Sequence, residues 1–442
     1  MAGLKRPSPG RAFAAIAVPI AAVLLALLPD RAFSQERTLT LDEAYRLAVA
    51  SHERVALAGE GMKQAEADLG KTIARVLPNI TAEGSYTRYT SEKSSAAFVI
   101  QPKSSTNAEL RITQPLYSGG KEWAIQRQAR LQIKSARAGL EGAQEGVLLD
   151  TSRSYYGVLK AQKDLAIKKA ALRRAEERLD VAKARLKVGE VTRSAVLRAE
   201  AEMAGAEAEL IKSGNSLENA KTLLKRMTAI EDSFTVSEPP PLPLAVKPAA
   251  ELVDVALKER YDYSQRLFEE KAATEGITVA RAGFKPSLKL EGLYTWRDQE
   301  PATTFLLEES ASGTLRLTYP IFEGFLRKAE LNEARSNLRE AELRRLGLRR
   351  DIEVQIRESL NNVSAVEALV ESFRRQLAFA EEDYKMVFEQ FRFGVATTVD
   401  VIDAENTLVS AQSSYANAVY DLELAKIDLL YVTGTLVPGV KE

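Results

Sequence analysis

Few side chains in this 442-residue sequence have the types and spacing that chemistry requires. There is no cysteine and one histidine, His52, so thiolate metal sites and histidine-based catalysis are nearly excluded. No nucleophile elbow, phosphate-binding loop or metal motif occurs. Asp400 and Asp403 are three residues apart, which places both carboxylates on nearly one face of a helix. We predict no catalytic residue, no metal and no cofactor. At the least, these acids stabilise a helix start by about 0.3–1 kcal/mol through its dipole.

The elements that must position this pair occur twice in the chain. The segment Leu110–Gly119 (LRITQPLYSG) recurs 205 positions later as Leu315–Gly324 (LRLTYPIFEG), and the same offset relates Gly189 to Gly394. Repeats of this length are duplicated supersecondary units. We therefore predict one elongated body made of two interleaved halves.

The N-terminus has the pattern of an export signal. A basic start with Lys5 and Arg6 precedes an apolar run over residues 12–28, and Ala32-Phe33-Ser34 offers a cleavage site before Gln35. We predict a signal peptide over residues 1–34; a membrane anchor is the alternative, although the run is shorter than the roughly 20 residues of a membrane span. Removing residues 1–34 leaves a charge of about −3, which gives no electrostatic case for nucleic-acid binding.

Four segments alternate with the period of a β-strand. We predict strands over about 80–90 and 108–115 in the first half, and over about 287–297 and 313–320 in the second. In the third segment Leu290 and Tyr294 share an apolar face, whereas Lys289 and Glu291 lie on the other. This pattern is typical of a transmembrane β-barrel, although a hairpin packed on helices would alternate in the same way.

A stretch of about 70 residues without proline follows each strand pair, enough for a helix of about 100 Å. Apolar residues recur every seven positions in both stretches, which indicates coiled-coil packing. In the first stretch the row is Val158, Leu165, Leu172, Leu179 and Leu186.

Each long helical stretch contains a glycine where the chain turns back. We predict turns over about 187–194 and 392–399, with Thr192 capping the returning helix of the first. The first repeat then covers residues 35–237 and the second 249–436. A proline-rich linker over 238–248 joins them, and 437–442 form a tail.

Four strands cannot close a barrel, which needs about eight or more. Open sheet edges are costly in lipid, because unpaired backbone groups have no water to bind there. Several chains must therefore pool their strands if these are transmembrane, and two, three or four chains would give 8, 12 or 16.

The tip of the second repeat, Phe393–Glu405, reads FGVATTVDVIDAE. This segment is similar to a glycine turn followed by Asp-Val-Leu-Asp-Ala, which is the signature of the TolC-type outer-membrane efflux channels. The ending Tyr431–Leu436 (YVTGTL) also resembles the family's usual close, and the resemblance extends over about 39–436.

The resemblance implies a mainly α fold with a transmembrane β-barrel. Duplicated helical-hairpin and β-hairpin repeats form a homotrimer, with a 12-strand barrel in the outer-membrane lipid and a 12-helix coiled-coil tunnel through the periplasm. It implies a passive exit duct for efflux or type I secretion that docks with a periplasmic adaptor protein and an inner-membrane pump. The tip residues expected to take part in docking are Gly189, Val191, Thr192, Gly394, Val395, Thr397 and Thr398.

In such channels acidic side chains ring the narrow periplasmic entrance, and Asp400 and Asp403 occupy those positions. The first repeat departs from the pattern with Ala195 in place of the acid. Where some members carry a latching arginine and tyrosine, this chain has Ala396 and Phe391. A hydrophobic gate of Phe391 or Phe393 is the replacement we predict.

Two other classes of protein share part of this pattern. A periplasmic adaptor is also exported and rich in helical hairpins, but needs compact domains around one hairpin rather than two repeats with strands. A coiled-coil scaffold that never enters a membrane would lack the alternating strands.

Overall fold

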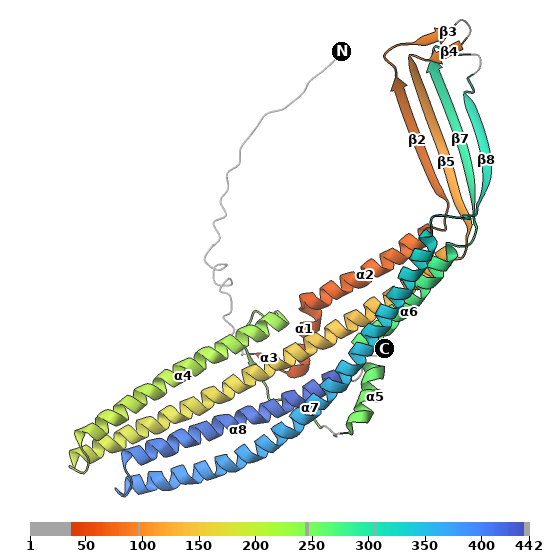
Figure 1. Ribbon diagram of the computed structural model, residues 1–442. Helices are drawn as coiled ribbons and strands as arrows, with labels where there is room; N and C mark the ends of the chain where they lie inside the picture. Colours follow the sequence, from red (N-terminus) through yellow and green to blue (C-terminus); the bar gives the residue numbers. More distant parts are fainter. Residues whose placement is uncertain (1–36, 96–97, 244–246, 304–305, 437–442) are drawn as a thin grey trace, which may run out of the picture.

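The computed structural model describes residues 37–95, 98–243, 247–303 and 306–436. A four-stranded sheet forms one end of an elongated molecule, and long helices run from it to two hairpin tips at the other end (Figure 1). The predicted signal peptide and the predicted tail lie outside the described residues.

The sheet contains β2 (Asn79–Arg88), β5 (Ser104–Ser118), β7 (Ser287–Glu300) and β8 (Glu309–Thr318) in the order β2-β5-β7-β8, and every pair is antiparallel. The central pairing of β5 with β7 joins the two halves of the chain. Within this sheet β2 and β8 are edges with one partner each.

The register separates apolar from charged side chains. Ala82, Leu110, Tyr294 and Ala311 form one row across the four strands, and Ile112 pairs with Gly292 on the same face. The opposite face holds the ion pairs Arg111–Glu109, Lys289–Glu291 and Arg316–Glu291. The sheet is therefore amphipathic, as the alternation predicts.

The strands differ from the sequence prediction at their outer ends. β5 begins at Ser104, four residues before the predicted start, since Ser104–Asn107 pair with Arg297–Glu300 of β7. These four residues are polar and show no alternation, so the sequence pattern did not reveal them as a strand. A small hairpin of β3 (Lys93–Ser95) and β4 (Phe98–Gln101) also occupies the predicted loop between β2 and β5.

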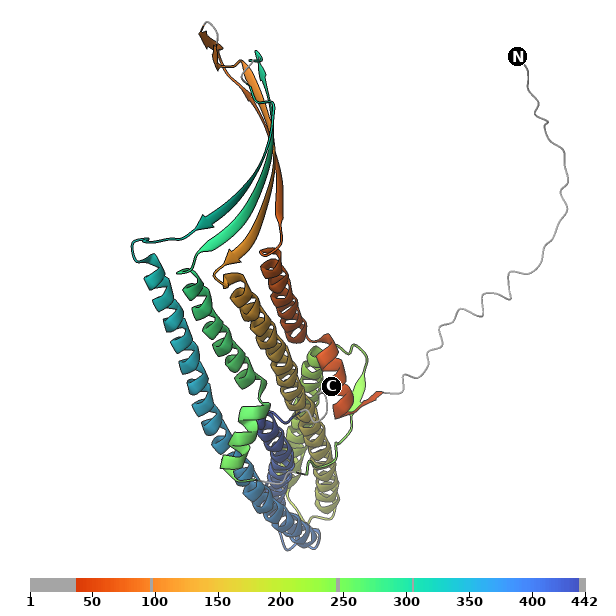
Figure 2. The ribbon, with the colours of Figure 1, turned by 90° about the vertical axis from the view of Figure 1, so that its right-hand side faces the viewer.

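Two helices run the whole length of the helical body. α3 (Lys121–Lys187) and α7 (Leu326–Arg392) begin beside the sheet and end at the tips. Near the sheet they lie in one layer with α2 (Glu53–Ala74) and α6 (Tyr261–Ala282), in the order α2-α3-α6-α7 (Figure 2). Near the tips α4 (Arg193–Thr228) packs on α3, and α8 (Thr398–Thr433) packs on both α3 and α7. No helix among the described residues is long and apolar enough to cross a bilayer.

The main core lies midway along the helices. There α1 (Leu41–Ser51) packs on α3 and α4, and β1 (Arg37–Leu39) pairs in parallel with β6 (Phe234–Val236). The buried Tyr155 hydroxyl donates to the carbonyl oxygens of Leu39 and Ser237, at 2.8 and 2.7 Å. α5 (Ala249–Glu259) covers α7 on the other side. The β1–β6 pair was not expected from the sequence, and it fixes both ends of the first repeat to α3.

Candidate functional site at the hairpin tips

Both hairpins turn at a glycine with left-handed backbone. We call residues 188–192 the first tip and residues 393–397 the second tip. Gly189 has φ of +81° and Gly394 has φ of +78°. Beyond each glycine an amide bonds back to the helix, Glu190 to the Arg185 carbonyl at 3.0 Å and Val395 to the Gln390 carbonyl at 2.8 Å. Such closures satisfy carbonyls that a helix end leaves free.

Asp400 and Asp403 are both exposed, but only Asp400 is tied to its own helix. The Asp400 carboxylate accepts hydrogen bonds from the Thr397 amide and hydroxyl, both at 2.7 Å, and the Asp400 amide donates to the Thr397 hydroxyl at 3.3 Å. This capping box satisfies two free amides at the start of α8. Asp403 makes no side-chain hydrogen bond or ion pair with any residue that the structure describes. Asp403 is therefore the carboxylate of this pair whose side chain makes no contact of this kind within the described structure.

The capping box makes the start of α8 sensitive to acid. Hydrogen bonds from the Thr397 hydroxyl and amide hold the pKa of Asp400 below its usual value. Because the folded-state pKa is lowered, this stabilisation is complete above the usual pKa and is lost as pH falls through the lowered one.

We therefore expect hydrogen-exchange protection of the Thr397 and Asp400 amides to decrease below about pH 4. In Asp400→Asn that acid-dependent loss should vanish. The first tip is the internal control, since Thr192 forms no such box. Unchanged protection of α8 in acid would contradict the box.

The first tip lacks the cap that the sequence led us to predict. Thr192 occupies the N-cap position of α4, but its hydroxyl forms a hydrogen bond with that of Ser194 at 2.8 Å and bonds no helix amide. The prediction that Thr192 caps the helix through its side chain is wrong. With Ala195 in place of an acid, no side chain in the described part of the chain returns a hydrogen bond to the Thr192 amide.

The two candidate gate residues lie in opposite environments. Phe391 is 1% exposed, and the Arg185 guanidinium lies 5.5 Å from the centre of its ring. Phe393 is 81% exposed. Of the predicted pair only Phe393 remains a candidate, because the ring of Phe391 is covered by its own chain.

Arg185 links the first hairpin to the second tip, a contact that sequence reasoning missed. Its Nη1 donates to the Phe391 carbonyl at 2.9 Å, and its Nε lies 3.0 Å from the Glu190 carboxylate. A Cβ on Gly394 would lie 2.8 Å from Nη2. The left-handed backbone favours glycine at position 394, whereas the flexible Arg185 side chain could shift to admit a Cβ.

A buried ion cluster joins the two hairpins on the sheet side of the tips. Glu405 of α8 is 5% exposed and accepts from Arg174 at 3.0 Å and from Arg178, which is 3% exposed. The Arg174 guanidinium also lies 5.7 Å from the ring centre of Tyr384 on α7. Burial, with a smaller effect of Glu405, raises the pKa of Tyr384 to about 12. Glu405 belongs to the tip signature, but only the fold shows that it faces two arginines.

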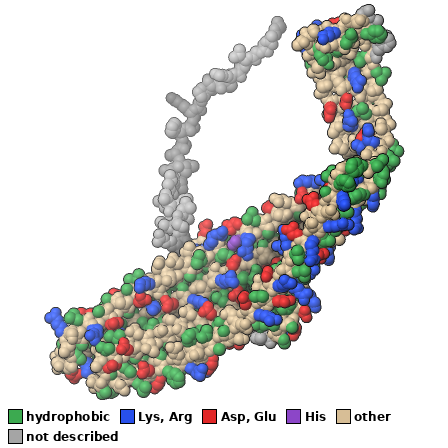
Figure 3. Space-filling view, viewed as in Figure 1, with side chains coloured by type: hydrophobic (Ala, Val, Ile, Leu, Met, Phe, Trp, Pro, Cys, Tyr) green, Lys and Arg blue, Asp and Glu red, His purple; other side chains and the backbone are tan. Residues whose placement is uncertain are grey.

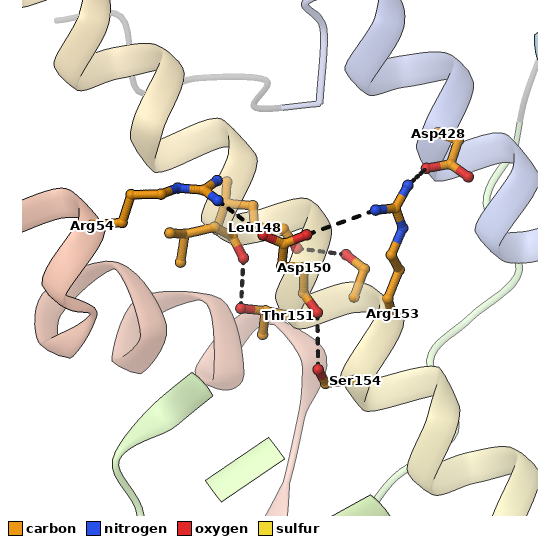
Figure 4. A network of polar contacts seen from close by, with 9 residues as sticks. Arg54, Leu148, Asp150, Thr151, Arg153, Ser154 and Asp428 are labelled. Atoms are coloured by element: carbon orange, nitrogen blue, oxygen red, sulfur yellow. Dashed lines mark hydrogen bonds and ion pairs between the residues drawn. The ribbon is translucent and has the colours of Figure 1, made fainter. Parts of the chain in front are cut away.

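The seam between α3 and α8 continues upward with the same distribution of charge. Lys160 pairs with Asp421, and Arg153 pairs with Asp428 at 2.9 Å. Figure 4 shows Arg153 between Asp428 and Asp150, which in turn contacts Arg54 of α2. In the ion pairs that join α3 to α8 in the described structure, every cation lies on α3 and every anion lies on α8.

Each hairpin, by contrast, has its own apolar core near the tips. The α3–α4 hairpin packs around Leu179, Ala182, Val196 and Ala199. The α7–α8 hairpin packs around Ala380, Leu408 and Ala411. Near the tips the hairpins are therefore separate apolar units joined by a polar seam, whereas in the main core Tyr156 of α3 packs with Tyr420 of α8.

The described structure thus combines an amphipathic sheet, whose edges β2 and β8 have one partner each, with two long helical hairpins. The sequence matches the model of a family described as outer membrane efflux protein over residues 44–229 and 252–435. This chain belongs to that family.

Relatives and solved structures agree with this assignment. The chain is 24% identical over 356 residues to outer membrane protein TolC of Escherichia coli strain K12, across 75% of this chain and 70% of that protein. It is 24% identical over 329 residues to outer membrane efflux protein BepC of Brucella suis, across 74% and 72%. The fold matches the Campylobacter jejuni CmeC outer membrane channel with a TM-score of 0.78 and 19% identity, over 91% of this chain and 87% of that one.

The chain is thus an outer-membrane channel, an exit duct of an efflux or secretion system, and it is not an enzyme. The predicted fold class is confirmed, a mainly α protein with a small membrane sheet. The adaptor, scaffold and enzyme alternatives are wrong, because the family match covers both repeats.

Proposed function

We propose that three copies of this chain form a 12-strand barrel and a 12-helix tunnel. The unpaired edges β2 and β8 of an amphipathic four-stranded sheet carry this proposal. Exposed backbone edges are not tolerated in lipid, so β8 of one copy must pair with β2 of the next. Twelve strands also leave a lumen, which the charged face of the sheet would line.

We further propose that a periplasmic adaptor docks at the tips and connects the duct to an inner-membrane pump. Apolar side chains protrude at both tips, where Val188 is 71% and Val395 is 77% exposed. Exposed apolar groups at the far end of a periplasmic tunnel suit a protein partner. Gly189, Val191, Thr192, Gly394 and Thr397 shape the two turns of this docking surface, whereas Thr398 is buried at the start of α8.

The aperture of the duct is the second tip. Three copies of Asp403, supported by Asp400, would form a ring of carboxylates that attracts cations. Phe393 lies beside it and is free to narrow the opening as an apolar constriction.

Single-channel recording in a planar bilayer tests the duct and its aperture together. We expect small, cation-selective openings from the wild type and loss of that selectivity in Asp400→Ala/Asp403→Ala, because the carboxylate field is removed. Asp180→Ala is the matched control, since it removes an exposed acid of α3 near the first tip.

Unchanged selectivity in the double variant would place the aperture elsewhere. Failure of the folded wild-type protein to insert would contradict the duct itself. Asp403→Ala alone should lose most of the selectivity if the Asp400 carboxylate mainly caps α8.

A further inference from the structure

Exposed apolar side chains gather where the sheet meets the helices. We define the collar as Leu77, Trp123, Phe284, Ile321, Phe322 and Phe325, which lie in or beside the four connections between strands and helices. Ile321 is 90% exposed and Phe322 is 72% exposed. Figure 3 shows hydrophobic side chains at this bend, with Lys and Arg over the adjoining helices. Such a cluster on a protein surface indicates a partner.

Phe325 is the most informative member of the collar. It has φ of +64°, a left-handed conformation that side chains other than glycine rarely adopt. The equivalent residue of the first repeat is Gly120, with φ of +88°. Phe325 is 71% exposed and its ring touches Phe322 edge-on, with the centres 5.4 Å apart. Burial within the chain does not compensate for the strain, which favours a contact between this large ring and something outside the chain.

The position of the collar identifies that partner. Leu315 and Leu317 lie on the apolar face of β8 and are 63% and 68% exposed. Tyr319 continues the same spacing immediately before the collar and is 58% exposed. Because the apolar face of this outer-membrane sheet meets hydrocarbon, the collar lies at the periplasmic boundary of the membrane. Aromatic side chains favour that boundary.

Cations lie next to the collar on all four helices. We call Arg75, Lys121, Arg281 and Lys328 the collar cations, at the sheet-proximal ends of α2, α3, α6 and α7. All four are exposed, and none forms an ion pair with a residue that the structure describes. The nearby acids Asp68 and Glu323 are paired with Lys71 and Arg327. Glu122 and Glu330 also lie near this boundary and form no ion pair with a described residue. The four collar cations outnumber these two acids, so the boundary carries an excess of positive charge.

We propose that the collar and its cations form a binding surface for phospholipids of the inner leaflet of the outer membrane. The rings insert at the boundary between acyl chains and headgroups, and the collar cations bind headgroup phosphates, with a preference for anionic lipids. This inference rests on the proposed barrel and adds the headgroup chemistry that fixes its depth in the membrane.

Tryptophan quenching by brominated lipids tests the insertion. The reporter is Phe325→Trp in a Trp123→Phe/Trp296→Phe background, which removes both native tryptophans. In vesicles of phosphatidylcholine brominated near the headgroup end of the chains, we expect blue-shifted and strongly quenched emission. Phe393→Trp at the second tip should stay unquenched. Phe322→Trp gives the same readout if the first reporter fails to assemble.

Competition between lipids tests the headgroup preference. Brominated phosphatidylglycerol should compete for the reporter about two- to fivefold better than brominated phosphatidylcholine. Lys121→Gln/Lys328→Gln should bring this ratio close to one. The control Lys183→Gln/Lys187→Gln removes two cations near the far end of α3 and should leave the ratio unchanged.

Blue-shifted but unquenched emission would show that a second copy covers the collar, and would overturn the proposal. Equal competition by the two lipids would overturn its headgroup part. Conductance of the same vesicles separates this inference from the duct, since an unquenched reporter in a conducting channel refutes the collar alone. Quenching without conductance would refute the duct alone.

Discussion

Glu405→Gln is expected to destabilise the helical body by about 3–5 kcal/mol per protomer and to loosen the seam between the hairpins. The substitution keeps the size of the side chain but removes the only anion that faces Arg174 and Arg178 in the described structure. Arg178 is 3% exposed, so its charge would remain buried without neutralisation. Urea unfolding followed by circular dichroism would measure the loss.

Asp428→Asn is the matched control for that experiment. It also breaks an α3–α8 ion pair, but the Arg153 and Asp428 side chains are 53% and 35% exposed. Water screens such a pair, and we expect a change of about 0–1 kcal/mol. Equal effects of the two variants would contradict the distinction between buried and exposed pairs on this seam.

The apolar triple variant Arg174→Met/Arg178→Met/Glu405→Leu separates charge from packing, because it replaces every member of the cluster. Replacing buried ion pairs by apolar side chains of similar size is often neutral or stabilising, so we expect recovery of most of the stability lost in Glu405→Gln. We also expect Glu405→Gln channels to show larger openings than the triple variant. The reason is that in Glu405→Gln the seam between the hairpins weakens, while each hairpin keeps its own core near the tips.

Local features of the fold could be predicted from the sequence because they depend on neighbours along the chain. Alternation predicts which face of β7 carries Leu290 and which carries Glu291. Left-handed backbone at Gly189 and Gly394 follows from glycine at the end of a long helical pattern. The duplication of the pattern at an offset of 205 positions then supports each assignment a second time.

Contacts between the hairpins could not be predicted in this way. Arg178 and Glu405 are 227 positions apart, and each alone looks like a charged residue on a helix surface. Phe391 has the pattern of a tip residue, but its burial depends on Arg185 of the other hairpin. Thr192 has the right residue type for a cap, yet a capping box also needs an acid three residues later. Such roles depend on how α3 meets α7 and α8, which no local pattern contains.

Lysine on the apolar face of the sheet should block assembly in the membrane, whereas lysine on the charged face should be tolerated. Ala311→Lys and Ser312→Lys are neighbours of similar size that point to opposite faces. Ala311 lies in the row of Leu110 and Tyr294, so its lysine would face hydrocarbon at a cost of about 2–4 kcal/mol per protomer. Ser312 pairs with Leu293 on the face of Arg111 and Glu291, where a lumen would hydrate the charge.

Folding into lipid vesicles, followed by the amount of oligomer that resists cold detergent, would measure both variants. Three protomers share one barrel, so the cost of Ala311→Lys is incurred three times in each assembly. We expect little oligomer from Ala311→Lys and nearly normal yield with altered ion selectivity from Ser312→Lys. Since the two variants carry the same charge one residue apart, only the environment of the two faces can separate them. If both assemble equally well, the apolar face of the sheet does not meet lipid.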